Sequence, residues 1–417
     1  MPDNSNTVAP VDQESQTVPD SSKKLATVDA SINAPVDVLV DQESTTEAPN
    51  DNQQSEKSFI FRTFINDKIF WGAIAVLLLA NIGLHQNIFT GRWFGFMLAS
   101  YSAVCNDSIQ TLGTFIASNT GIVAWWKQWL WISAIFLGTT LFSYYKYDGD
   151  ISYQRLKSKG FDVAPESFNY LQIASAIILL ILTRLKVPVS TTFMILTSFV
   201  ATPKALGATI QKSVIGYALS FGLATLVWLP FSHFIKEYCD KTRGKLSAVW
   251  RYAQWACTGT LWSVWLMQDM STIAVFLPRS LSTTEIIFVC SNIVAGLGFI
   301  LFRGGEKIQQ VVEEKSRIKD LPEATMVDLL YAIILFVFKI ASKIPMSTTW
   351  CFVGLLAGRE ISIAFRKAGS KTLMAAFKMS ATDLAKVTFG FLISIVVGCG
   401  ANEKVRQSIV DMFKKDL

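Results

Sequence analysis

Two hydroxyl-rich motifs of the form Pro-x-Ser-Thr-Thr occur in this 417-residue chain, and each could bind an anion. The first comprises Pro188, Ser190, Thr191 and Thr192, and the second comprises Pro345, Ser347, Thr348 and Thr349. Proline disfavours helix in the residue before it, so the incoming helices should end near Lys186 and Lys343. Ser and Thr start helices well, and a helix N-terminus offers free N–H groups to an anion. We therefore predict that these hydroxyls bind an anion.

A second pair of motifs places one aspartate in each half of the chain beside amide and hydroxyl side chains. The residues are Asn106, Asp107 and Gln110 in the first half, and Gln268, Asp269 and Thr272 in the second. The polar residue three positions after each aspartate lies on the same helical face as the aspartate. Carboxylate, amide and hydroxyl oxygens can replace the water around a bare alkali cation. We therefore predict that these six residues bind cations and that both aspartates also face the anion.

The two kinds of motif recur in the same order and at nearly the same spacing. Pro188 follows Asp107 by 81 residues, and Pro345 follows Asp269 by 76 residues. Paired interruptions at matching places of two halves point to the binding site of a membrane transporter. The sequence therefore predicts two transporter repeats, residues 92–240 and 241–405, which we expect to be inverted.

Seven long apolar runs, most of them nearly free of charge, surround these motifs: 69–89, 129–145, 171–182, 215–231, 284–302, 326–340 and 384–400. Most approach the roughly 20 residues with which a helix crosses about 30 Å of hydrocarbon. Only 17% of all residues are charged, whereas soluble domains carry about a quarter. We predict an all-α, polytopic integral membrane protein with an extra transmembrane helix at 58–91. The apolar run after each Ser-Thr-Thr should return as the short helix of a re-entrant hairpin, because it is too short to span a membrane.

The chain begins with a segment of a different composition. Residues 1–57 hold eleven acidic and three basic side chains and almost no aromatic residue. Such a segment cannot bury enough apolar area to offset its chain entropy, so we predict a disordered acidic tail. Residues 406–417 should form a short C-terminal tail. The body between the tails is basic, which fits loops that face the cytoplasm and anionic lipids and gives no sign of nucleic-acid binding.

Cysteine and histidine offer no metal centre. The six cysteines are scattered without a CxxC spacing, and there are only two histidines, His85 and His233. The cysteines are therefore interpreted as small buried apolar residues. We predict no cofactor and no bound metal other than a coupling sodium ion.

The two proposed ligand sets constrain each other through charge. An anion such as phosphate would be repelled by two neighbouring carboxylates unless cations or protons bind with it, and this requirement couples the two fluxes. A protonated phosphate can donate a hydrogen bond to an aspartate, whereas sulfate cannot and would leave that acceptor unpaired.

These motifs resemble those of the inorganic phosphate transporter (PiT) family, in which GANDxANxxG and P[VI]STTH occur once in each half. The resemblance covers about residues 92–400 and is strong only at the motifs. It implies inverted repeats, re-entrant hairpins and uptake of inorganic phosphate by symport with sodium ions or protons. It also implies that Asp107, Asp269, Ser190, Thr191, Ser347 and Thr348 surround the phosphate.

The chain departs from the family pattern at the cation ligands more than at the anion ligands. The second Asn of the motif is Gln110 or Thr272, the first Asn of the second half is Gln268, and the usual His is Phe193 or Trp350. Because a proton needs only a carboxylate and no fixed cage of oxygens, we favour proton over sodium coupling.

Several alternatives stay open at this point. A phosphate sensor or uncoupled channel derived from a transporter would also explain the altered cation ligands, and another oxyanion could replace phosphate. An intramembrane aspartyl protease is disfavoured, because neither aspartate has a Tyr-Asp or Gly-x-Gly-Asp context. We therefore do not expect an enzyme. We expect a multi-pass protein of the plasma or inner membrane, and a homo-oligomer is an open alternative.

Overall fold

The computed structural model describes residues 68–119, 122–157, 161–185, 187–200, 203–242, 247–302, 321–341, 346–369 and 371–407. All of these residues belong to one compact unit. The predicted acidic tail 1–57 and most of the predicted tail 406–417 lie outside the described residues. Within the described ranges all regular secondary structure is helical, which confirms the prediction of an all-α chain.

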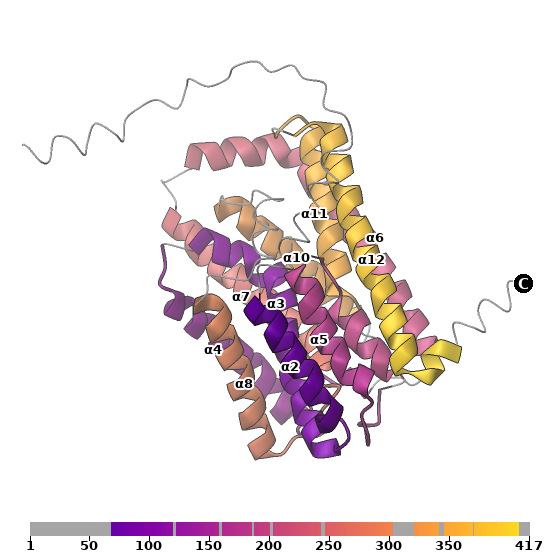
Figure 1. Ribbon diagram of the computed structural model, residues 1–417. Coiled ribbons are helices and arrows are strands. Elements are labelled where there is room, and N and C mark those ends of the chain that lie inside the picture. Colours follow the sequence, from indigo (N-terminus) through magenta and orange to yellow (C-terminus); the bar gives the residue numbers. More distant parts are fainter. Residues whose placement is uncertain are drawn as a thin grey trace, which may run out of the picture. The chain divides into compact units, whose positions relative to one another are not determined.

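The helices follow one another in an order that recurs in the two halves (Figure 1). After α2 (Lys68–Leu84), the first half contains α3 (Ile88–Asn119), α4 (Trp125–Lys146), α5 (Tyr170–Arg184), the π-helix η3 (Thr192–Leu196), the 3-10 helix η4 (Thr197–Phe199) and α6 (Pro203–Thr242). The second half contains α7 (Ser247–Ala274), α8 (Thr283–Phe302), α10 (Leu321–Ala341), α11 (Thr348–Phe365) and α12 (Leu373–Ala401). In both halves the helix that carries the motif aspartate comes first, and the helix that starts in the Ser-Thr-Thr motif comes fourth. That the halves are inverted stays a prediction.

All seven apolar runs fall on helices, although two boundaries differ from the prediction. The first run does not continue as one helix to residue 89, because the Asn87 side chain starts a new helix there. Its Oδ1 accepts hydrogen bonds from the backbone N–H groups of Phe89, at 2.9 Å, and Thr90, at 3.3 Å. The predicted boundary between the repeats, at 240/241, lies just inside the end of α6, which reaches Thr242.

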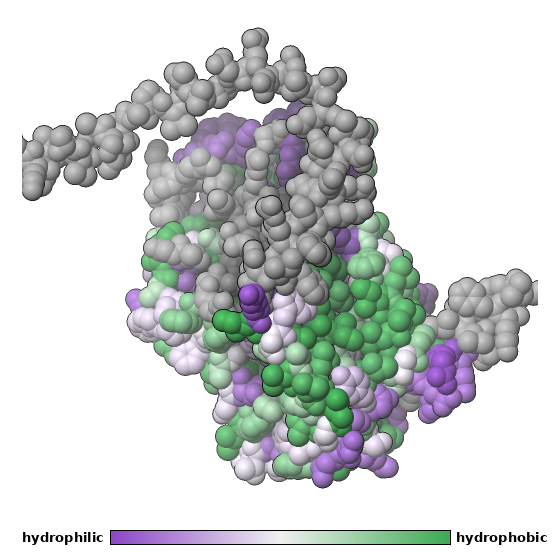
Figure 2. All heavy atoms as spheres, viewed as in Figure 1, coloured by the Kyte–Doolittle hydropathy of each residue, from purple (hydrophilic) through white to green (hydrophobic). Residues whose placement is uncertain are grey.

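The helices present apolar side chains outward, as expected for a protein in lipid. Among the described residues, four helical segments are long and apolar enough to cross a membrane, and between 22% and 50% of the residues in their apolar windows are buried inside the protein. Large side chains such as Leu226, Phe234 and Val396 are at least 67% exposed. Figure 2 shows apolar residues gathered over much of the visible face. A soluble monomer rarely exposes so large an apolar surface, so we conclude that this is a membrane protein.

Two glycines bring α11 against α6. A Cβ atom added at Gly354 or Gly358 would collide with the backbone carbonyl oxygens of Tyr217 or Phe221 on α6. The two glycines are four residues apart and therefore on one face of α11, a spacing that lets membrane helices approach closely. The hairpin helix of the second half is thereby fixed against the last helix of the first half (Figure 1).

Candidate functional site

The two aspartates of the sequence motifs lie together in the interior of the protein. Asp107 lies in the middle of α3 and Asp269 near the end of α7, two helices that pack against each other. Their side chains are 0% and 2% exposed, and they are close enough to interact electrostatically. The structure therefore brings the two halves of the predicted carboxylate pair together.

The Ser-Thr-Thr motifs follow interruptions where the prolines predicted them. Helix α5 ends at Arg184 and α10 ends at Ala341, two residues before the predicted ends. Pro188 lies in the non-helical segment after α5, whereas Pro345 lies outside the described residues.

Each interruption ends with a serine that caps the next helix. The hydroxyl of Ser190 accepts a hydrogen bond from the N–H of Phe193 at 3.2 Å, and that of Ser347 accepts one from the N–H of Trp350 at 3.3 Å. The two serines therefore hold the hairpin backbone in place, and neither donates to an aspartate among the described residues.

The short return helices differ from the prediction in the second half. After Ser190 the chain forms a five-residue π-helix and a three-residue 3-10 helix, which fits a short hairpin. After Ser347, however, α11 continues for 18 residues to Phe365. The expectation of a short return helix was wrong here, because α11 does not end with its apolar run and continues through Arg359 and Glu360. These two side chains pair with each other, Arg359 also binds Glu323 at 2.5 Å, and Glu360 binds Lys371 at 2.9 Å.

Threonine hydroxyls of the first hairpin reach both carboxylates. Thr191 donates a short hydrogen bond to Oδ2 of Asp107, and Thr192 donates to Oδ1 of Asp269 at 3.1 Å. Thr348 of the second hairpin lies beside Asp269 as well. One hairpin therefore bridges the aspartates of the two halves.

The second hairpin contacts the first half through Thr349. Its hydroxyl accepts a hydrogen bond from Nε2 of Gln110 at 3.1 Å and donates to the backbone oxygen of Val189 at 3.5 Å. The two motifs therefore interlock, and neither half could form this site alone.

The predicted cation ligands leave several buried oxygen atoms without a partner. The amide nitrogen of Asn106 already donates two hydrogen bonds. Its Nδ2 donates to Oδ1 of Asp107 at 2.7 Å and to the carbonyl oxygen of Val189 at 2.6 Å. Four other oxygens have no hydrogen-bond partner among the described residues: Oε1 of Gln110, Oε1 of Gln268, Oδ2 of Asp269 and Oγ1 of Thr272. Buried polar atoms are normally bonded, so unbonded ones require an explanation. The chemistry of these oxygens fits a cation or the O–H groups of a protonated anion.

Two buried basic side chains that the sequence analysis did not single out belong to this region. Arg155 is 2% exposed, its Nε donates to the carbonyl of Met267 at 2.9 Å, and it interacts electrostatically with Asp269. Lys212 on α6 is 8% exposed and interacts electrostatically with Arg155. The next residue, Ser213, accepts a hydrogen bond from the N–H of Ser347 at 2.8 Å. Only Lys212 had a signal in the sequence, as a basic side chain just before the apolar run 215–231.

Arg155 reaches this place because the segment after α4 folds inward. Its first turn is built around Asp150, whose Oδ1 accepts from the N–H of Ser152 at 2.7 Å and whose Oδ2 accepts from the N–H of Gln154 at 2.9 Å. Ile151 and Leu156 of the same segment are buried. This charged stretch separates the apolar runs 129–145 and 171–182, yet part of it contributes to the interior.

The aromatic residues that stand in place of the family's histidine join the two hairpins. The rings of Phe193 and Trp350 meet edge to face with centroids 6.1 Å apart, and both contact Phe391 of α12. This cluster adds apolar packing behind the hydroxyls and supplies no titratable group.

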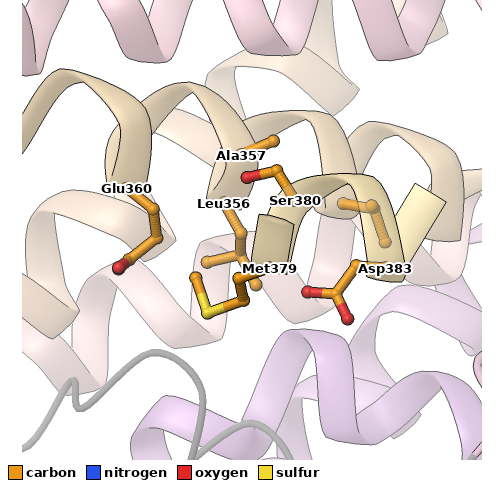
Figure 3. A pocket seen from close by; sticks show the side chains of 7 residues that line it. Leu356, Ala357, Glu360, Met379, Ser380 and Asp383 are labelled. Atoms are coloured by element: carbon orange, nitrogen blue, oxygen red, sulfur yellow. The ribbon is translucent and has the colours of Figure 1, made fainter. Parts of the chain in front are cut away.

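A separate pocket lies between α11 and α12 (Figure 3). It is lined by Val353, Leu356, Ala357, Glu360, Met379, Ser380 and Asp383. None of the predicted site residues lines it, and its Glu360 is already paired with Arg359 and Lys371. We therefore do not connect this pocket with the carboxylate pair.

Comparison with known proteins supports the fold. No protein-family model and no curated protein matches the chain. Among solved structures, one described as "The sodium-dependent phosphate transporter" superposes with a TM-score of 0.52 at 14% sequence identity, covering 81% of this chain and 99% of the other. The chain therefore shares its fold with a solved phosphate transporter structure.

Proposed function

We propose that this protein carries inorganic phosphate across a membrane by symport with a cation, in several membrane passes. The observation that supports this most directly is the buried pair Asp107 and Asp269, bridged by the hydroxyls of Thr191 and Thr192. Two buried carboxylates, hydroxyl groups and a helix start offer the mixture of acceptors and donors that a partly protonated oxyanion requires. The described phosphate transporter of the same fold supports the same substrate.

Charge balance supports a coupled rather than a free passage of the anion. Asp107 and Asp269 together carry two negative charges when ionised, and the nearby Arg155 and Lys212 offer two positive ones. A phosphate adds one or two negative charges to a low-dielectric interior, where an unbalanced charge is costly. At least one further positive charge must therefore enter with the phosphate.

We propose a proton as the coupling cation. Arg155 and Lys212 are resident positive charges, so a phosphate monoanion needs only one further positive charge, and one proton on an aspartate supplies it. Sodium is the alternative, favoured by the unbonded oxygens of Gln268, Asp269 and Thr272. Sodium would need about five or six oxygens at short range, and the same atoms could instead accept from the O–H groups of a protonated phosphate.

The test is uptake of labelled phosphate into proteoliposomes under an imposed pH gradient, with sodium replaced by choline. We expect concentrative uptake that the pH gradient drives. Uptake that collapses without sodium would establish sodium as the coupling ion, and uptake that only equilibrates would indicate an uncoupled channel.

Competition in the same assay tests the anion. We expect arsenate to compete and sulfate not to compete at about tenfold excess, because only a protonated anion can donate to the aspartates. Equal inhibition by sulfate would show that the aspartates do not face the anion.

A further inference from the structure

A third carboxylate is buried between three helices, apart from the aspartate pair. Asp328 on α10 is 1% exposed. Its Oδ1 accepts a hydrogen bond from Thr114 of α3 at 2.7 Å, and its Oδ2 accepts one from Thr258 of α7 at 2.6 Å. Neither oxygen contacts a Lys or Arg among the described residues.

Asp328 lies inside one of the four segments that can cross a membrane, Leu321–Phe338. It is seven residues from the start of α10, which corresponds to about 10 Å along the helix axis. A carboxylate at such a depth with only neutral partners is costly as an anion and is therefore a candidate functional group. It can exist in two states, with and without a proton.

On one side, the helix that carries Asp328 also carries a tyrosine close to the proposed phosphate site. Tyr331 follows three residues later on the same face of α10 and is fully buried. Its hydroxyl donates to the backbone oxygen of Thr348 at 2.9 Å, and it interacts electrostatically with both Asp107 and Asp269. The Tyr331 side chain is therefore near the aspartate pair and about one helical turn from Asp328 along α10.

On the other side, a buried polar network continues from Thr114 to the end of α3. Gln254 of α7 donates to the hydroxyl of Ser118 at 2.6 Å and accepts from Nδ2 of Asn119 at 3.2 Å. Arg251, which is only half-buried, donates to Oδ1 of Asn119 at 3.3 Å. Polar side chains therefore extend from Asp328 to a partly exposed arginine.

We propose that Asp328 is a proton-binding site that passes the coupling proton between the aspartate pair and the surface near Arg251. This inference rests on the proposed symport of phosphate. Both oxygens of Asp328 already receive O–H donors, an arrangement that suits a proton better than a bare metal cation. Two other titratable side chains lie close to Asp328. Cys257 of α7 interacts with it electrostatically, and Tyr331 is on the same face of α10.

The experiment compares two modes of transport in proteoliposomes. Exchange of labelled for unlabelled phosphate at equal pH needs no net movement of protons, whereas net uptake under a pH gradient does. In the Asp328→Asn variant we expect exchange within about twofold of wild type and net uptake reduced about tenfold or more. Asp328→Glu should restore part of the net uptake, because it restores a carboxylate. Asp383→Asn on α12 is the matched control and should retain both modes.

Each other outcome decides against the inference. Normal pH-driven uptake in Asp328→Asn would overturn it, and so would an equal loss of both modes in Asp328→Asn and Asp328→Glu proteins that remain monodisperse. Loss of a sodium-dependent component alone would make Asp328 a sodium ligand instead. Absence of exchange and uptake in the wild type would instead refute phosphate transport itself, and this inference with it.

If Asp328→Asn does not fold, Thr258→Val provides the same comparison with the carboxylate retained. It removes one hydroxyl from the proposed path, so net uptake should fall more than exchange. Equal effects of Thr258→Val on the two modes would overturn the inference.

Discussion

Single side chains around Asp107 and Asp269 determine how charge is distributed in the interior. Asp107 accepts from a hydroxyl and from an amide, so both of its oxygens are bonded, whereas Oδ2 of Asp269 is not. Arg155 interacts electrostatically with Asp269, and Lys212 interacts with Arg155. The two aspartates are thus unequal, and Asp269 is the better placed for a ligand that is not part of the protein.

Both aspartates should nevertheless be required for transport. We expect Asp107→Asn and Asp269→Asn each to lower phosphate uptake about tenfold or more. The amide keeps the shape of the side chain but can no longer hold a proton or balance a cation. Uptake in proteoliposomes measures this, with size-exclusion chromatography as the check on folding. Wild-type rates in either variant would remove that aspartate from the site.

Arg155 should contribute to anion binding through its charge. We expect Arg155→Gln to weaken phosphate binding about tenfold and Arg155→Lys to weaken it less, because a fixed positive charge in a buried site attracts the anion. Equilibrium binding of labelled phosphate is the measurement.

The matched control for this variant is Arg279→Gln. Arg279 is also bound to backbone oxygens, those of Phe161 at 3.0 Å and Val163 at 2.9 Å. Within the described part of the chain, no interaction links it to Asp107 or Asp269. Its replacement should leave phosphate binding unchanged. Equal effects of the two glutamine variants would mean that Arg155 only holds the loops.

Helix contacts fix the hairpins that carry the hydroxyls. The N-terminus of α11 carries Thr348 and Thr349, and the Gly354 and Gly358 face of α11 is pressed against α6. The first hairpin is held by α12, because a Cβ at Gly390 would come within 2.9 Å of Val189. The hairpins therefore depend on small residues at two helix crossings.

Replacement of glycine by alanine should affect stability differently at a crowded and at an open position. We expect Gly354→Ala to destabilise the protein by about 1–3 kcal/mol through overpacking against Tyr217. Gly296→Ala on α8 has open space around its Cβ and should be neutral or stabilising by up to about 1 kcal/mol, because alanine favours helix. Thermal unfolding in detergent compares them. If Gly354→Ala were as stable as Gly296→Ala, the close approach of α11 to α6 would be refuted.

At the level of the whole chain, the site is shared between the two halves. Thr192 of the first half binds Asp269 of the second, and Gln110 of the first binds Thr349 of the second. The acidic segment 1–57 precedes both halves and contains neither kind of motif.

Deletion of residues 1–57 should therefore leave transport intact. We expect the truncated protein to take up phosphate at a rate within about twofold of the full chain. The comparison requires equal amounts of inserted protein, measured by immunoblotting of the proteoliposomes. Loss of uptake by an inserted, monodisperse truncation would make the tail part of the transporter.

Much of this arrangement could be predicted because it is encoded locally and twice. A proline before Ser-Thr-Thr interrupts a helix whatever surrounds it, and α5 and α10 end within two residues of Lys186 and Lys343. The length of an apolar run indicates a helix in lipid. All seven runs fall on helices, the first of them with a break at residues 85–87. Recurrence at similar spacing identified Asp107 and Asp269 as one site although 162 residues separate them.

The groups that were missed belong to neither of the repeated motifs. Asp328 lies within the predicted span 326–340 and could have been noticed, since an acidic residue in an apolar helix is functional by default. No pattern in the sequence, however, relates Asp328 to Thr114 and Thr258, or Arg155 to Met267. Those neighbours are set by which faces of α3, α7 and α10 pack together. The local chemistry of each motif could therefore be predicted from the sequence. The partners of each charged group could not, because helix packing depends on the shapes of many side chains at once.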